Sequence, residues 1–382
     1  MPLEKYRKGI YSCSKSGACK NSFPETLCMP TCPQIEKFHF DAFYVGGWAY
    51  LARKLINGQI ELNPGMADIL YTCTTCGVCE EVCANDAPAT EIMDEFRFDL
   101  VKAGFGPMPA HKEAAENISK THNPYGESHD RRTAWLTETV PNKADVIYFA
   151  GSTAAYKTPE IASGAVKILN AAGVPFGILE DEWDSGELLF RTGQRDAAAD
   201  VMKHNVDAIR NAGAKTIITS DPHAYVAFKR DYEMPDVEVI HTTQYFNDLI
   251  QAGKLTLRTP VAQKVTYHDP CNLSRKYRSL LRGGQVVEPP RDILKSLQVE
   301  NIEMVRSKNW SWCCGAGGGI YLAFPDYAIW TGMERLKETE KTGASTVVTA
   351  CPLCKVNLVN AAQKMNSQMK IADINELVVQ AI

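Results

Sequence analysis

The sequence has no cysteine between Cys83 and Cys271, although its 382 residues include 13 cysteines. Any cysteine-ligated metal therefore lies in two separate regions, one before this gap and one after it. No apolar run reaches the roughly 18 residues that a membrane helix needs, which predicts no transmembrane segment. A net charge of −4 without a basic stripe argues against nucleic acid as a partner.

The charged segment 1–8 also lacks the apolar stretch of a secretion signal, which predicts a cytoplasmic protein. Disulfides are rare in that compartment, and an odd number of cysteines leaves one unpaired. The 13 cysteines therefore favour metal ligation. Contents of 45% hydrophobic and 23% charged residues are ordinary for a globular protein, and the length allows two or three domains.

The first cysteine region ends in a compact motif, C-x2-C-x2-C-x3-C, at residues 73–83. In ferredoxins this spacing holds a cubane [4Fe–4S] cluster with three thiolates, and the fourth serves a second cluster. The earlier segment, residues 13–32, has wider spacing. Cross-ligation predicts one cubane held by Cys13, Cys19, Cys28 and Cys83, and a second held by Cys73, Cys76, Cys79 and Cys32. Two alternatives stay open: a pair of structural zinc sites, or a single cubane at the regular motif.

The second cysteine region contains five cysteines: Cys271, Cys313, Cys314, Cys351 and Cys354. Two adjacent thiolates and a C-x-x-C loop suit iron, and five donors exceed the four of a tetrahedral zinc site. This pattern predicts one inorganic cluster.

The chain contains an internal repeat. Residues 146–152 parallel 265–271, residues 184–186 parallel 313–315, and residues 212–224 parallel 342–354. The first copy replaces all five cysteines, with Ser152, Asp184, Ser185, Asp221 and Ala224. We therefore expect the first copy to hold no cluster.

The pattern predicts an α+β protein with four parts. These are a mostly helical two-cluster ferredoxin-type domain (1–105), a linker with short helices (106–143), a cysteine-free α/β repeat (144–258) and a cysteine-bearing α/β repeat (259–382). Strands are predicted at 146–150, 174–179, 216–219, 237–240, 264–267, 301–305 and 346–349. Helices are predicted at 38–55, 91–102, 162–172, 197–212, 290–297, 325–341 and 353–366. The alternation indicates parallel sheets, whose sites form beyond the carboxyl ends of strands, where Cys271 and Cys351 lie.

Three features near the second region each have two interpretations, and the sequence decides between them only for the third. Arg275, Lys276 and Arg278 either offset the charge of an anionic cluster or form a solvated face. His268 is either a structural residue at a strand end or a proton relay. The glycines at 315–319 indicate a small-residue loop whose N–H groups approach cluster sulfurs, rather than a nucleotide loop, because the third glycine of G-x-G-x-x-G would fall on Ile320.

The motifs at 73–83, 104–107, 267–271, 312–319 and 349–354 resemble those of heterodisulfide reductase D-type iron–sulfur oxidoreductases. The resemblance implies two CCG domains and a non-cubane [4Fe–4S] cluster. Its ligands, and the residues that would carry any catalysis, are then Cys271, Cys313, Cys314, Cys351 and Cys354. Members of this family serve in larger anaerobic complexes, including a class II benzoyl-coenzyme A reductase assembly.

The resemblance therefore predicts an electron-transfer subunit with flavoprotein or ferredoxin-type partners. A catalytic heterodisulfide (thiol–disulfide) reductase subunit is the alternative. It is disfavoured because that chemistry uses two non-cubane centres and the first repeat has lost its ligands. A zinc-stabilised scaffold is the third possibility.

Overall fold

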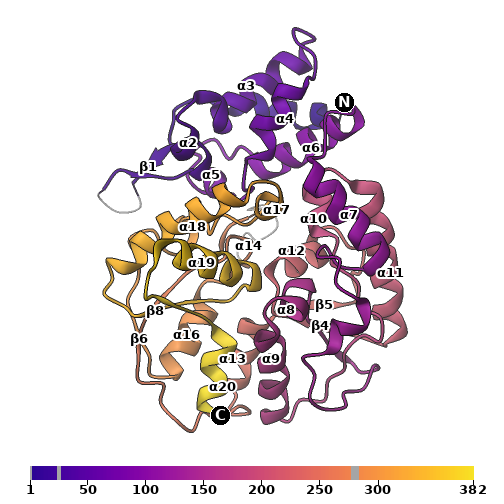
Figure 1. Cartoon of the computed structure of the whole chain (residues 1–382), viewed down its shortest axis with the longest axis vertical. Helices are drawn as coiled ribbons and strands as arrows, with labels where there is room; N and C mark the ends of the chain where they lie inside the picture. The colour runs from indigo at the N-terminus through magenta and orange to yellow at the C-terminus, as the bar shows by residue number, and fades with distance from the viewer. Residues whose placement is uncertain (1, 24–26, 277–283) are drawn as a thin grey trace.

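The computed structural model describes residues 2–23, 27–276 and 284–382, and it has a mixed α+β fold (Figure 1). The helical N-terminal part lies above two α/β repeats that stand side by side. Arg278, for which the sequence predicted a charge role, lies outside the described residues.

The N-terminal part consists of short elements around one apolar core. They are η1 (Pro2–Tyr6), α1 (Arg7–Ser12), β1 (Asn21–Ser22), β2 (Met29–Pro30), α2 (Pro33–Phe38), η2 (Asp41–Phe43), α3 (Val45–Ile56), α4 (Pro64–Tyr71), α5 (Val78–Glu81) and α6 (Ala89–Lys102). Trp48, Leu70 and Phe96 are central to this core. The helix expected at 38–55 begins only at Val45. A turn precedes it, and a Cβ at Gly47 would lie 1.9 Å from the Asp41 carbonyl oxygen, so glycine is required there.

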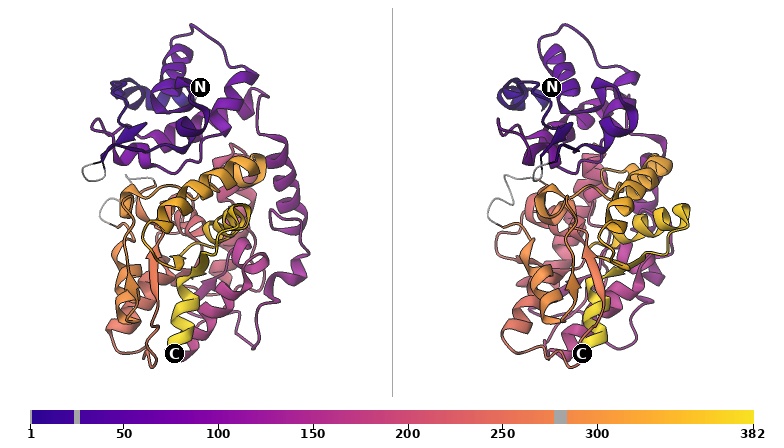
Figure 2. Two further views of the ribbon diagram at one scale, coloured as in Figure 1. Left: turned by 60° about the vertical axis from the view of Figure 1, so that its left-hand side comes forward. Right: turned by 90° about the vertical axis from the view of Figure 1, so that its left-hand side faces the viewer.

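The segment predicted as a linker contains one long helix, α7 (Pro109–Thr121), and the turn η3 (His129–Thr133). Helix α7 runs from the N-terminal part down beside the first repeat (Figure 2). It also contacts α17 (Ile320–Ala323) of the second repeat, so this connection joins all parts of the molecule.

The two repeats have the same parallel topology. The first sheet has the order β3 (Val146–Phe149), β4 (Thr216–Thr219), β5 (Glu238–His241), with Gly177 bridged to Ile147 at its edge. The second has the order β7 (Glu300–Asn301), β6 (Lys264–Tyr267), β8 (Thr346–Thr349), β9 (Lys370–Asp373). The strands β6 and β8, which lead to Cys271 and to Cys351 and Cys354, correspond to β3 and β4.

The helices of the two repeats pack against each other. The first repeat contains α8 (Ser152–Tyr156), α9 (Pro159–Ala171), α10 (Glu187–Arg191), α11 (Arg195–Asn211), α12 (Pro222–Arg230) and α13 (Thr242–Gln251). The second contains α14 (Cys271–Ser274), α16 (Glu288–Ser296), η4 (Lys308–Trp310), α17, α18 (Pro325–Glu340), α19 (Pro352–Met365) and α20 (Ile374–Ala381). The last helix of each repeat packs on the first long helix of the other, α20 on α9 and α13 on α16. One apolar core therefore runs through both sheets.

Two strand predictions were wrong at the sheet edges, and one edge strand was missed. Residues 174–179 form only the bridge at Gly177, since Pro175 has no N–H with which to extend the ladder. The strand expected at 301–305 is the two-residue β7, and β9 was not predicted. Edge strands pair on one side only, so their sequences carry a weaker pattern. The predicted limits at 105, 143 and 258 fall between elements, and the division into domains stays a prediction.

Candidate metal centres

The five cysteines of the second repeat converge at one edge of its sheet. Cys271 opens α14 after β6, and Cys351 is the N-terminal cap of α19 after β8, with Cys354 in the first turn. Because β6 and β8 are neighbouring parallel strands, their carboxyl ends bring Cys271 and Cys351 to the same edge. Cys313 and Cys314 reach it from the loop after η4.

Their thiols form one continuous series. Cys313 hydrogen-bonds with Cys271 and Cys314, and Cys354 hydrogen-bonds with Cys314 and Cys351. All but the partly buried Cys271 are 5% exposed or less. Backbone N–H groups point at the sulfurs, with Gly315 N 3.3 Å from Cys313 Sγ and Cys354 N 3.4 Å from Cys351 Sγ. Buried, converging thiols with N–H donors fit an iron–sulfur cluster.

The surroundings favour the thiolate, which is the form that binds metal, at three of the five cysteines. Cys313 and Cys354 donate the hydrogen bonds, and donating them raises the pKa of both thiols well above the usual range. Hydrogen bonds from Cys313 and Cys354 hold the pKa of Cys314 well below its usual range. The hydrogen bond with Cys313 lowers the pKa of Cys271. At Cys351, burial opposes ionisation, but the hydrogen bonds from Cys354 and His223 bring its pKa down to about 7.

His268 lies within ligand distance of Cys314 and Cys354, with the three candidate ligand atoms within 4.8 Å of one another. However, Arg335 Nε donates to His268 Nδ1 at 3.1 Å. A guanidinium only donates, so Nδ1 accepts and the ring proton is on Nε2. His268 therefore hydrogen-bonds to Cys314 as a donor. This hydrogen bond orients a candidate ligand, a role that the sequence did not suggest for His268, since it left open only a strand-end residue or a proton relay.

In the N-terminal part, one cavity is lined by the four cysteines predicted for the second cubane, Cys32, Cys73, Cys76 and Cys79. Cys32 directly precedes α2, Cys73 and Cys76 lie on the loop between α4 and α5, and Cys79 lies in α5. Thr75 N is 3.4 Å from Cys73 Sγ, which again supplies a backbone donor. Burial raises the pKa of Cys32, Cys73 and Cys79, so their thiolates require a metal charge beside them.

A second cavity in this part is lined by Cys13, Cys19, Cys79 and Cys83. Three of these were predicted for the first cubane. The fourth predicted ligand, Cys28, is exposed and is not among the residues that line this cavity. The ligand set Cys13, Cys19, Cys28 and Cys83 stays a prediction.

The cysteine loops of the two regions touch each other. The Cys76 thiol hydrogen-bonds with Cys313, which holds the pKa of Cys76 well below its usual range. A Cβ at Gly318 would lie 2.8 Å from the Cys73 carbonyl oxygen, and one at Gly317 would lie 2.9 Å from that of Thr74. The glycine loop after the cysteine pair therefore packs against backbone of the cubane loop, a close approach that only glycine allows.

The equivalent pocket of the cysteine-free repeat is lined by hydrogen-bonded polar groups. Ser152 Oγ donates to Asp184 Oδ2 at 2.7 Å, and Gly186 N donates to Asp184 Oδ1 at 2.8 Å. His223 Nδ1 lies 3.1 Å from Asp221 Oδ1, and His223 also hydrogen-bonds with Cys351 of the other repeat. Burial raises the pKa of Asp184 to about 6.

A cavity joins this pocket to the glycine loop. Its lining includes Asp184, Asp221, His223, Tyr321 and residues 316–319, so both repeats contribute. No cysteine is among the lining residues that the structure describes.

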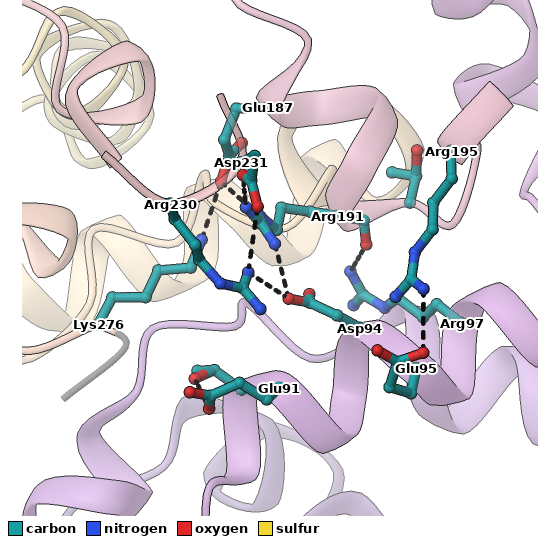
Figure 3. Close-up of polar contacts among 12 residues, drawn as sticks. Glu91, Asp94, Glu95, Arg97, Glu187, Arg191, Arg195, Arg230, Asp231 and Lys276 are labelled. Atoms are coloured by element: carbon teal, nitrogen blue, oxygen red, sulfur yellow. Dashed lines mark hydrogen bonds and ion pairs between the residues drawn. The ribbon is translucent and has the colours of Figure 1, made fainter. Parts of the chain in front are cut away.

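Buried ion pairs fix the N-terminal part to the repeats (Figure 3). Asp94 of α6 accepts hydrogen bonds from Arg191 at 2.7 Å and Arg230 at 3.0 Å. Arg191 also pairs with Asp231 and Glu187. Lys276, which follows Cys271, pairs with Glu187 at 2.9 Å and is 1% exposed. Its charge is therefore buried, which rules out the solvated face for this lysine.

Comparisons with known proteins agree with this arrangement. The family model described as CCG, a cysteine-rich domain, matches residues 146–229 and 265–359, and so covers both repeats. The D-type subunit of dihydromethanophenazine:CoB–CoM heterodisulfide reductase from Methanosarcina barkeri is 37% identical over 87% of this chain and 84% of its own length. The B-type subunit of fumarate reductase (CoM/CoB) from Methanothermobacter marburgensis is 29% identical over 92% of this chain and 70% of its own.

A solved structure with a similar fold is a hypothetical protein from Helicobacter pylori, with a TM-score of 0.56 and 9% identity over 88% of this chain and 67% of that one. Among the described residues, no helix is both long and apolar enough to traverse a lipid bilayer.

The fold and the converging thiols define a CCG-domain iron–sulfur oxidoreductase subunit. Within that class, the chain belongs to the D-type heterodisulfide reductase family. It therefore has an iron–sulfur electron-transfer role.

Proposed function

We propose that this protein relays electrons through two cubane clusters and one non-cubane cluster within a cytoplasmic anaerobic complex. The observation that carries the proposal is the contact between Cys76 and Cys313, which joins the two cysteine regions. Cys79 lines both N-terminal cavities, so the three candidate centres follow one another through the molecule. When bound, a [4Fe–4S] cluster accepts and releases one electron at a time.

Each region then has a distinct part in the proposal. Cys32, Cys73, Cys76 and Cys79 hold the middle centre, and the cysteines of the second repeat hold the last. Gly317 and Gly318 pack so closely on the cubane loop that neither position has room for a Cβ. We propose flavoprotein or ferredoxin-type partners that supply hydride chemistry, and a class II benzoyl-coenzyme A reductase complex as the specific assembly.

A second candidate function is reduction of a small disulfide at the last centre. The observation in its favour is the cavity beside Cys351, which is lined by Asp184, Asp221 and His223. Reduction of a disulfide to two thiols takes two electrons and two protons, and buried acids beside a redox centre are suited to supply protons. Against it, Ser152, Asp184, Ser185, Asp221 and Ala224 replace the ligands of a second non-cubane centre.

The test is to reduce the purified chain with a low-potential dye under anoxia and then offer acceptors separately. Rapid reoxidation by a flavoprotein, with none by a heterodisulfide, supports the relay. Rapid reoxidation by the disulfide alone, with release of thiol, contradicts the relay and supports the reductase. A colourless protein that contains stoichiometric zinc contradicts both and supports the scaffold.

A further inference from the structure

Arg275 lies between the two cysteine regions and is 1% exposed. Its Nε donates to the carbonyl oxygen of Cys76 at 2.9 Å, and its Nη1 donates to that of Asn309 at 3.2 Å. Its charge acts on the thiols of Cys76, Cys271 and Cys313. One buried cation therefore faces a ligand of the middle centre and ligands of the last centre.

The third nitrogen of this guanidinium, Nη2, is buried and has no nitrogen or oxygen acceptor among the described residues, and the guanidinium makes a side-chain hydrogen bond with the Cys76 thiol. A buried guanidinium N–H without an acceptor is costly, so such a group normally faces one. The groups beside it include the thiols of Cys76, Cys271 and Cys313, on which its charge acts. Thiolates and sulfides of bound clusters are the acceptors that fit this position.

Arg97 gives the contrast. It is also fully buried at this junction, but Nε, Nη1 and Nη2 all donate to carbonyl oxygens, including those of Cys73 at 2.6 Å and Gly318 at 2.9 Å. Its hydrogen bonds therefore account for all its nitrogens, and they tie the two loops together. Arg275 makes only two hydrogen bonds to backbone carbonyl oxygens among the described residues, and these leave its Nη2 without a backbone acceptor.

We propose that Arg275 is a positioning residue that bridges the middle and last centres, holding their ligand loops together and setting the reduction potentials of both. The inference rests on the proposed function, because it requires clusters in both sites. Reduction adds negative charge to a cluster, so a buried cation between two clusters favours the reduced form of each.

The experiment is a redox titration of the iron-loaded full chain, followed by electron paramagnetic resonance. In Arg275→Gln, which removes the charge, we expect the equilibrium constant for reduction of both centres to fall about tenfold, or about 59 mV for a one-electron couple. In Arg275→Lys, which keeps the charge, we expect a fall of less than about threefold.

The matched control is Arg132→Gln. Arg132 is buried too, donates to the carbonyl oxygens of Leu179 and Glu180 in the cysteine-free repeat, and likewise has one nitrogen without a partner among the described residues. We expect it to leave both potentials unchanged. Equal shifts in Arg132→Gln and Arg275→Gln overturn the proposal, because the effect is then not local.

The proposal is also overturned if Arg275→Gln titrates as the wild type does, or if only one centre shifts. If Arg275→Gln does not bind its full iron, Arg275→Lys is the deciding variant. A tenfold fall in its equilibrium constants for reduction overturns the proposal, and values within threefold of the wild type support it. Wild-type protein that lacks separate signals from the two centres contradicts the proposed function instead, so the two failures are distinguishable.

Discussion

Replacing Asp184 by Asn should stabilise the protein at alkaline pH. Asp184 is 8% exposed, and burial raises its pKa from 3.8 to about 6. The folded protein thus binds this proton more tightly than the unfolded chain does, so the free energy of unfolding falls as pH rises from about 3.8 to about 6. Above about pH 6 the free energy of unfolding stays lower by the full cost of burying the ionised carboxylate.

The magnitude follows from the difference in pKa, about 2.2 units at 1.36 kcal/mol each, which gives about 3 kcal/mol at pH 8. At pH 5 the titration is incomplete, and the same two pKa values give about 1.6 kcal/mol. Asn keeps an acceptor for Gly186 N, and its amide can donate to Ser152 Oγ, so the hydrogen bonds are preserved. The gain at pH 8 corresponds to a rise of about 4 °C in the unfolding midpoint for a chain of this length.

The assay is calorimetric unfolding of iron-loaded wild type and Asp184→Asn at pH 5 and pH 8 under anoxia. Metal loss affects both proteins alike, so the comparison uses the difference between them. The control is Asp200→Asn, an exposed carboxylate on α11 of the same repeat, which should change the midpoint by less than about 1 °C. A gain that is equal at the two pH values, or a loss at pH 8, would refute the reasoning.

Three further predictions concern the metal centres and the interface. Fully loaded protein should contain about 12 iron atoms per chain, about four for each of three clusters; anaerobic metal analysis that finds eight or fewer removes a cluster from the proposal. Cys351→Ser should abolish the paramagnetic signal of the last centre and spare the cubane signals, and loss of all signals would contradict the assignment to separate regions. Asp94→Ala leaves the buried charge of Arg191 and the partly buried charge of Arg230 without this carboxylate, so it should lower the free energy of unfolding by about 3 kcal/mol. An unchanged calorimetric midpoint would show that these pairs do not stabilise the interface.

Much of the fold could be read from the sequence because its determinants are local. The central strands β4, β6 and β8 have the predicted limits, since a buried parallel strand is a short, continuous apolar run bounded by turn residues. Helices α9, α11, α18 and α19 also lie within a few residues of their predictions. The edge strand β5 also lies within one residue of its prediction, whereas the edge segments at 174–179, β7 and β9 departed from prediction.

The candidate ligand sets also differ in how far the sequence determines them. The spacing of Cys73, Cys76 and Cys79 within one motif groups them, and Cys32 lines the same cavity, while their role as one ligand set stays a prediction. Cys28 does not line the other cavity, because the long segments around it leave its position to tertiary packing. The sequence also identified which repeat lacks thiols, since five substitutions are visible without a structure.

Only the tertiary structure decided how the two cysteine regions meet. The contact between Cys76 and Cys313 joins residues more than 200 positions apart, and it depends on the docking of α6 through Arg97 and Asp94. The same docking buries Arg275 between the thiols, although sequence alone left open whether its charge is solvated. Spacing along a loop is fixed by covalent geometry, whereas contacts between distant loops depend on which surfaces bury their apolar and charged groups against each other.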